Sequence, residues 1–392
     1  MSPRALVRHF DQLPARELDR LFGRRPQGFS AASAQLGYYL GATLYMKGTR
    51  LHLAEDLARQ RARGTASIIL DLEDAIADDA VVGAQAHIIE QLRTALAAGY
   101  VLPLVFVRVR HESQISEIAC ALGAARSLLS GFVLPKFDSC PADGGLDQVA
   151  AAGAEYGHRF LAMPVLEGRA LAYRETRASV LAATSDAVAG HADLVPVVRI
   201  GATDISGVFG LRRPPELTVY DLAVVRDVIC DIVNTFARPG SSSVISGCVW
   251  EYFTPAARVL KPELRSTPFT PLGRHGRDIR DDLLATDSDA LIKEVVLDKA
   301  NGLVGKTVIH PSHISVVHSL MSVSAEEYAD AICVLGSDGG GASSSDYGNK
   351  MNELGPHRAW AQRISQRADA FGVLAENVSF ADLLISQADH QG

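Results

Sequence analysis

The sequence predicts an α/β protein built on a (β/α)8 barrel, the TIM-barrel fold. Eight short runs of apolar, often β-branched residues recur along the chain, and such runs are typical of strands buried on both faces of a parallel sheet. Stretches with helical spacing separate most of these runs. Charged or polar residues follow several of the runs, and the catalytic groups of a TIM barrel lie at the carboxyl ends of its strands.

The predicted strands, in chain order, are residues 42–46, 67–71, 104–109, 131–135, 160–165, 196–201, 244–249 and 305–309. Three of the stretches between them have helical spacing and close on glycine, as a helix C-cap does: 51–64, 84–99 and 221–240. An open doubly wound sheet is the alternative, but the first strand-to-helix turn lacks the G-x-G-x-x-G of a nucleotide-binding sheet. We therefore favour the barrel.

Three regions do not fit the repeat of strand and helix. Residues 1–40 form an N-terminal leader with a helix near 16–22, ahead of a barrel domain that we place at 41–330. An insertion rich in Pro and Arg, 252–288, follows the seventh strand and is too long for an ordinary connection. Its position places it over the barrel mouth, as a functional loop, a small subdomain or a partner contact.

The last part of the chain, 331–392, is predicted to be a hinged helical extension. Its Gly/Ser-rich stretch 335–350 indicates a hinge, and 357–372 has helical spacing. We expect that helix to act as a lid on this subunit or on a neighbour. A tethered helix reaches a neighbour as readily as its own barrel, so we also expect a homo-oligomer.

Composition limits the class of protein. The 392 residues are 47% hydrophobic and 21% charged, which is enough apolar material for a large core. A formal net charge of −7 argues against a nucleic-acid partner, and small metabolites are the better expectation. The five cysteines are widely spaced and predict reduced thiols, while no window predicts a signal peptide or membrane span. These features predict a cytoplasmic protein.

Two acidic residues at the ends of apolar runs predict a metal site. Glu167 ends the run LAMPVLEG, and Asp204 ends VPVVRIGATD. Burying an ionised carboxylate there costs several kcal/mol unless a cation or a donor compensates it. The alternative is a structural pair of salt bridges. Other strand ends carry Arg50, Asp71, Glu73, Asp74, Arg108, Lys136 and His310.

The ordered blocks of the chain resemble the citrate lyase β-subunit family, within the HpcH/HpaI-type aldolases. These blocks are YMKGTR (45–50), IILDLEDA (68–75), VRV (107–109), VLPK (133–136), PVLEG (164–168), GATD (201–204) and GKTVIHP (305–311). The resemblance runs from about residue 40 to residue 330. It implies a TIM barrel and an enzyme that makes or breaks a C–C bond next to a carbonyl.

The resemblance also implies ligands and residue roles. Glu167 and Asp204 would coordinate Mg²⁺, a hard cation that prefers oxygen ligands and keeps positions open for substrate. Arg108 would clamp the carboxylate of a 2-oxo acid, and Arg50 would help to hold the substrate or a thioester phosphate. From the GATD block, Gly201 and Ala202 would contact the substrate.

Other charged strand ends have two interpretations each. Asp71, Glu73 and Asp74 are expected to hydrogen-bond metal-bound water and to orient Arg50 or Arg108. Alternatively, Asp74 caps a helix and Asp71 pairs with an arginine of the barrel. Lys136 is expected to pair with these carboxylates rather than to react as a Schiff base. His310 either touches the site or is satisfied by its neighbours.

Two departures from the family pattern bear on the substrate. Arg110 stands where the family commonly has Asn, which adds positive charge near the mouth and suits a more anionic or phosphorylated substrate. The family's C-terminal segment carries an Asp that acts in a neighbouring subunit's site, whereas GNKMNELGPH offers Asn352 or Glu353. Glu353 could act as an acid or base, but Asn352 could not.

The sequence therefore predicts a Mg²⁺-dependent C–C lyase or aldolase acting on a 2-oxo or 3-hydroxy acid, with acyl-CoA or a related thioester as the candidate second substrate. A pyruvate aldolase without CoA is the second interpretation. A non-catalytic barrel that serves as a binding or scaffold protein is the third.

Overall fold

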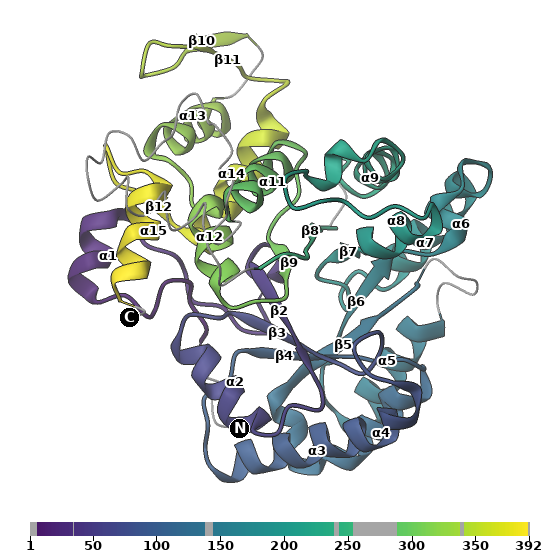
Figure 1. Ribbon diagram of the computed structural model, residues 1–392. Coiled ribbons are helices and arrows are strands. Elements are labelled where there is room, and N and C mark those ends of the chain that lie inside the picture. The colour runs from purple at the N-terminus through teal and green to yellow at the C-terminus, as the bar shows by residue number, and fades with distance from the viewer. Residues whose placement is uncertain are drawn as a thin grey trace.

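The computed structural model describes residues 6–33, 35–137, 144–238, 243–253, 288–337 and 341–390. Its centre is a closed barrel of parallel strands that pair in chain order (Figure 1). The strands are β2 (Ala42–Lys47), β3 (Ser67–Asp71), β4 (Leu104–Arg108), β5 (Leu129–Leu134), β6 (Leu161–Leu166), β7 (Val198–Ile200), β8 (Ile245–Trp250) and β9 (Lys306–Val308). The barrel closes where β2 pairs with β9, from Ala42 opposite Lys306 to Leu44 opposite Val308. The predicted (β/α)8 barrel is confirmed.

The barrel strands are apolar because both of their faces are covered. Every residue of β3, β4, β5 and β6 is buried. The outer faces pack against helices, and the inner faces fill the barrel. This double burial explains why the strands form unbroken apolar runs rather than alternating patterns.

Helices flank the barrel between and after its strands. They are α2 (Leu53–Ala62), α3 (Val81–Ala97), α4 (Ser113–Leu122), α5 (Gly144–Tyr156), α6 (Arg169–Ala172), α7 (Arg174–Gly190), α8 (Ala202–Val208), α9 (Ala223–Phe236), α11 (Ser288–Ala300) and α12 (Ser312–Met321). Gly64 and Gly99, just beyond the C-termini of α2 and α3, have φ of +89° and +69°. Glycine reaches this left-handed region without strain, so both helices end where the sequence predicts.

The two ends of the chain lie side by side. The predicted leader helix is α1 (Ala15–Leu21), and the strand that follows it, β1 (Phe22–Arg24), pairs antiparallel with β12 (Val373–Leu374). Helix α15 (Phe380–Asp389) contacts both α1 and α12 (Figure 1). The leader and the extension therefore form one layer against the barrel.

The C-terminal extension begins inside a helix. Helix α13 (Ala325–Gly336) crosses the predicted boundary at 330, because its apolar face packs against α14 (Arg358–Phe371) in one cluster. Within the predicted hinge, residues 338–340 lie outside the described chain. The residues after them form a hairpin of β10 (Ala342–Ser344) and β11 (Met351–Glu353), which extends away from the barrel in Figure 1.

The predicted lid helix does not cover the mouth of its own barrel. Helix α14 contacts α13, α12 and the 3₁₀ helix Leu36–Tyr38, which precedes β2 and so lies at the amino ends of the strands. A lid would have to reach their carboxyl ends. The expectation for this subunit is thus wrong, whereas a lid on a neighbouring subunit stays a prediction.

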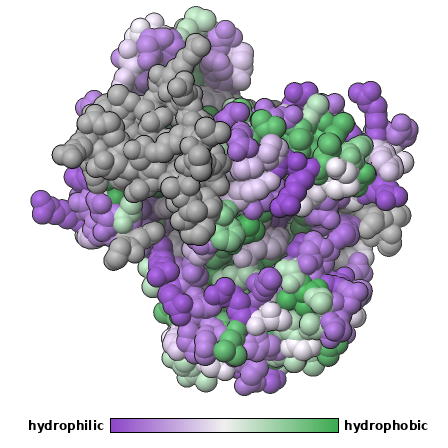
Figure 2. Space-filling model, in the orientation of Figure 1, coloured by the Kyte–Doolittle hydropathy of each residue, from purple (hydrophilic) through white to green (hydrophobic). Residues whose placement is uncertain are grey.

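The predicted insertion 252–288 falls almost wholly in 254–287, outside the described residues. Within the described chain, the cysteines Cys120, Cys230, Cys248 and Cys333 are free thiols, and no helix has the length and apolar character to cross a bilayer. Figure 2 shows hydrophilic residues over much of one face, with apolar residues in small groups between them.

A buried ionic network ties α11 back to the barrel wall. The Nζ atom of Lys306, on β9, lies 2.7 Å from Glu294 Oε1 and 2.8 Å from Asp298 Oδ2, and all three side chains are fully buried. Arg213 forms an ion pair with Glu294, and the hydroxyl of Tyr220 donates to Asp298 Oδ1 at 2.8 Å. These contacts satisfy charges that would be costly alone, and they fix α11 after the insertion.

Two buried histidines join the leader to the barrel. His9 and His318 have ring centroids 4.4 Å apart, and His9 stacks on Phe371 at 4.4 Å. His318 Nε2 accepts a hydrogen bond from the Ala42 N–H at 3.1 Å, while His9 Nε2 bonds the Tyr39 carbonyl at 2.9 Å. Burial lowers the pKa of His9 to about 3 and holds the pKa of His318 well below 6.5.

We predict that acid destabilises the protein through these two histidines. Their pKa values are depressed in the folded state, so below pH 6.5 the unfolded state binds more protons than the folded state. The free energy of unfolding therefore decreases as the pH is lowered. Each histidine contributes up to about 1.4 kcal/mol per pH unit. Urea unfolding between pH 7.5 and pH 5 measures the slope. His9→Phe should flatten it, since Phe keeps the stacking and removes one titrating group; an unchanged slope would contradict this assignment.

Candidate metal and substrate site

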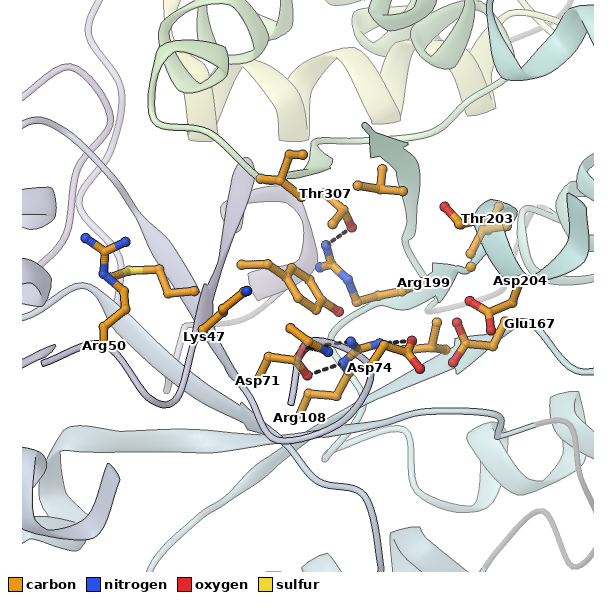
Figure 3. A pocket seen from close by; sticks show the side chains of 18 residues that line it. Lys47, Arg50, Asp71, Asp74, Arg108, Glu167, Arg199, Thr203, Asp204 and Thr307 are labelled. Carbon is orange, nitrogen blue, oxygen red and sulfur yellow. Dashed lines mark hydrogen bonds and ion pairs between the residues drawn. The ribbon is translucent and has the colours of Figure 1, made fainter. Parts of the chain in front are cut away.

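A pocket of about 530 Å³ opens at the carboxyl ends of the barrel strands. Figure 3 shows charged side chains from several strands pointing into it. Its polar lining residues include Lys47, Arg50, Asp71, Asp74, Arg108, Glu167, Arg199, Thr203, Asp204 and Thr307. Most of the predicted site residues thus meet in one place, because a parallel barrel gathers its strand ends at one mouth.

Glu167 follows β6 and is held by the backbone of the neighbouring strand end. Its side chain is 3% exposed, and its Oε1 accepts a hydrogen bond from the Lys136 N–H at 2.9 Å. Lys136 has φ of +49°, a conformation uncommon for a residue with a side chain. The turn after β5 therefore presents its N–H to the Glu167 carboxylate.

Gly201 leaves the space in which the Glu167 carboxylate lies. A Cβ at this position would stand 2.0 Å from Glu167 Oε2 and 2.4 Å from Glu167 Cβ. Its φ of −90° is open to any residue, so the requirement for glycine is steric. Gly201 lines the pocket, so its contact with the substrate stays a prediction, whereas Ala202 is buried and does not line the pocket.

Glu167 and Asp204 raise the energy of each other's charge. The pKa of Glu167 is raised to about 8; burial is the larger cause, and the charge of Asp204 is the next. Burial also raises the pKa of Asp204, with repulsion from Asp74 adding to it. A buried carboxylate whose pKa is raised by a second, partly buried one is typical of a cation site.

The donor set of such a site would be small. Among the described residues, no group of three or more His, Cys, Asp and Glu side chains is arranged to hold a metal ion. A cation bound by Glu167 and Asp204 would therefore complete its shell with water or ligand oxygens. That arrangement suits Mg²⁺, which keeps several waters and uses one or two carboxylates.

Arg108 is already surrounded by protein carboxylates. Its Nε and Nη2 donate to the two oxygens of Asp71 at 2.6 and 2.8 Å, a bidentate pair. Its Nη1 lies 2.8 Å from Glu73 Oε2 and 3.2 Å from Asp74 Oδ2. The three predicted acidic residues thus orient Arg108. A substrate carboxylate could reach Arg108 only by sharing it with them.

Lys136 pairs with an acidic residue, as the sequence predicts. Its Nζ forms an ion pair with Glu73 and lies 3.7 Å from Asp74 Oδ1. With Arg108, it balances the acidic loop that follows β3.

Arg110 does not add charge to the pocket. Its Nε donates to the Leu72 carbonyl at 3.2 Å, and its Nη2 donates to the carbonyls of Glu73 and Ile76 at 2.6 and 2.5 Å. Asp78 is its ion-pair partner. The expectation that Arg110 selects a more anionic substrate is therefore wrong, because its donors hold the backbone of the acidic loop.

The remaining predicted residues lie at the edge of the pocket or away from it. Arg50 lines the rim, is about half exposed, and pairs through Nε with Asp56 Oδ2 at 2.7 Å. His310 does not line the pocket and stacks on Phe253, with ring centroids 4.7 Å apart. Glu353 lies exposed on the β10–β11 hairpin and does not line the pocket of its own subunit.

Arg199 is a pocket residue that the sequence analysis missed. It lies on β7 inside the barrel, is 2% exposed, and donates to Thr43 Oγ1 at 3.3 Å. It also donates to Thr307 Oγ1 at 2.5 Å (Figure 3). A signal was present in the sequence, because an arginine in the middle of the apolar run VPVVRIGA must turn its charge into the barrel or its wall.

Comparison with known proteins identifies relatives of this fold. The family described as C-C bond lyases of the TIM-barrel fold matches residues 34–373. A search of curated proteins finds no match.

Solved structures with a similar fold include two from different organisms. One is the CitE protein of Mycobacterium tuberculosis in complex with magnesium, acetoacetate and coenzyme A: 19% identity, TM-score 0.50, covering 85% of this chain and 99% of that one. The other is the lead(II) complex of Haloferax volcanii malate synthase: 13% identity, TM-score 0.50, covering 71% of this chain and 72% of that one.

We predict that Arg108→Met lowers the free energy of unfolding by about 3–5 kcal/mol, because it leaves the buried Asp71 carboxylate without its partner. Urea unfolding at pH 7.5 measures the change. Arg59→Met is the control, since the Arg59–Asp56 pair is half exposed on the arginine side and should contribute no more than about 1 kcal/mol. Equal losses in the two variants would contradict the assignment.

Proposed function

The chain belongs to the family of C–C bond lyases with the TIM-barrel fold, and on that premise we propose that it is a Mg²⁺-dependent C–C lyase or aldolase acting on a 2-oxo acid. The observation that carries the proposal is the pair Glu167 and Asp204 at the barrel mouth, whose mutual repulsion a divalent cation would relieve. The CitE structure of the same fold contains magnesium together with acetoacetate, a 3-oxo acid, which is a precedent for the cation beside an oxo acid.

In this proposal Glu167 and Asp204 hold the cation, and the Lys136 N–H fixes the Glu167 carboxylate for that purpose. Bound Mg²⁺ would supply a Lewis acid that polarises a substrate carbonyl and stabilises negative charge on its oxygen. Asp74 lines the pocket beside this pair and would hydrogen-bond water there. Arg108 would keep the acidic loop in place, and Arg50 would meet an anionic ligand at the rim.

The placement of Glu353 bears on the choice between two reactions. Thioester chemistry with Glu353 as acid or base needs the hairpin of a neighbouring subunit, since Glu353 lies outside its own pocket. The exposed β10–β11 hairpin is suited to such a reach, so a homo-oligomer goes with this reaction. A pyruvate-type aldolase without CoA is the second candidate, and it is favoured if the protein is a monomer in solution.

The first experiment is calorimetric titration of the metal-free protein with Mg²⁺, then with oxaloacetate, glyoxylate and pyruvate, with and without acetyl-CoA. We expect Mg²⁺-dependent binding of a 2-oxo acid. Heat from acetyl-CoA would favour the thioester reaction, and exchange of pyruvate methyl protons without CoA would favour the aldolase. Ligand binding without any metal-dependent turnover would leave a binding or scaffold protein.

We predict that Glu167→Gln and Asp204→Asn each abolish Mg²⁺ binding, because each leaves one carboxylate for the cation. In the metal-free protein Glu167→Gln should keep or raise the melting temperature above pH 8, where the wild-type carboxylate is ionised against Asp204. Calorimetry and thermal unfolding measure the two effects. Mg²⁺ affinity equal to wild type in both variants would refute the site.

We predict that Gly201→Ala weakens Mg²⁺ binding by displacing the Glu167 carboxylate, although no ligand is removed. Gly207→Ala, near the other end of the helix that Gly201 precedes, is the control, since no atom lies within 4 Å of its added Cβ. It should leave Mg²⁺ affinity unchanged. The same calorimetric titration compares them, and equal affinities in the two variants would show that the space at Gly201 is not required.

A further inference from the structure

Arg199 carries a buried positive charge without an acidic partner. Its guanidinium is bonded by hydroxyls of Thr43 and Thr307 and lies 3.8 Å from Met163 Sδ. Its Nε has no hydrogen-bond partner, and it makes no ion pair with any Asp or Glu of the described residues. Burial lowers the pKa of Arg199; among its neighbours Tyr45 raises that pKa, and the Arg108 cation lowers it further.

Arg108 and Lys306, two other strongly buried cations of the barrel strands, are compensated. Arg108 has Asp71 and Glu73, and Lys306 has Glu294 and Asp298. An uncompensated guanidinium in the same interior costs several kcal/mol. A residue that destabilises the unliganded protein in this way is typical of a binding site whose missing charge arrives with the ligand.

Arg199 can contact a ligand because it lines the pocket on the side of the barrel interior. It lies on β7, two residues before Gly201, and it pairs in register with Val165, which is two residues before Glu167. It therefore lies one side-chain layer deeper than the carboxylate pair. Tyr45 lines the same part of the pocket and is a hydrogen-bonding neighbour of Arg199.

We propose that Arg199, assisted by Tyr45, receives a second carboxylate of the substrate, so that the site selects 2-oxo dicarboxylic acids over monocarboxylic ones. The 2-oxo acid end would lie at Glu167 and Asp204, and the far carboxylate would point down the barrel to Arg199. Guanidinium geometry suits a carboxylate, and the buried surroundings strengthen the pair. This inference rests on the proposed function for the position of the 2-oxo acid end.

The test compares oxaloacetate with 2-oxobutyrate, which has the same number of carbons and lacks the far carboxylate. Calorimetry in the presence of Mg²⁺ gives the dissociation constants for wild type, Arg199→Met and Arg199→Lys. We expect Arg199→Met to raise the dissociation constant of oxaloacetate at least about tenfold and to leave that of 2-oxobutyrate unchanged. Arg199→Lys should keep part of the preference, since it keeps the charge. Equal losses for both ligands, or no loss, would overturn the proposal.

The stability of the metal-free, unliganded protein is a second readout. Removing an uncompensated buried charge should raise the melting temperature in Arg199→Met, by about 2 °C or more. A fall would assign Arg199 to packing of the barrel core and overturn the proposal. Mg²⁺ affinity separates the two inferences: if wild type binds no Mg²⁺, the proposed function fails, while the melting temperatures still decide whether Arg199 is a strained binding residue.

Discussion

Compensation of buried charge is the constraint on which the mouth of this barrel depends. Closing eight parallel strands buries both faces of each strand, so the interior is apolar along most of its length. Most charged groups of the site lie at or near the carboxyl ends of the strands, and there the solvent is still largely excluded. Each charge placed in that layer needs a neighbour of opposite sign, and the arrangement of the site follows from which charges have one.

The site contains both kinds of charge. Arg108 is bonded by Asp71, Glu73 and Asp74, and Arg110 fixes the backbone from which those acidic residues project. That part of the mouth is complete without a ligand. Glu167 and Asp204 repel each other, and Arg199 has no acidic partner among the described residues. These uncompensated charges have opposite signs and lie in adjacent layers. Such an arrangement would let the site bind a cation and an anion together.

The terminal segments stabilise the opposite end of the barrel. Strand β1 pairs with β12, and α15 packs on α1 and α12. His9 stacks on Phe371 and meets His318 edge-on. The leader and the extension therefore hold the amino ends of the strands, while the β10–β11 hairpin extends outward (Figure 1). One end of the barrel is closed by the chain itself, and the other is left for ligands.

The sequence by itself determined the barrel, its eight strands, and the strand ends that carry Glu167, Asp204, Arg108 and the acidic residues after β3. Local patterns suffice for this, because apolar runs alternating with helices allow few topologies, and a parallel barrel brings all strand ends together. The sequence did not determine which arginine is compensated. Arg108, Arg110 and Arg199 are the same residue type at or near strand ends. Their partners come from other strands or from loop carbonyls, so only the tertiary structure shows which partners each arginine has. Only the tertiary structure also decided where α14 packs. The spacing of an amphipathic helix predicts a buried face but does not identify the element that covers it.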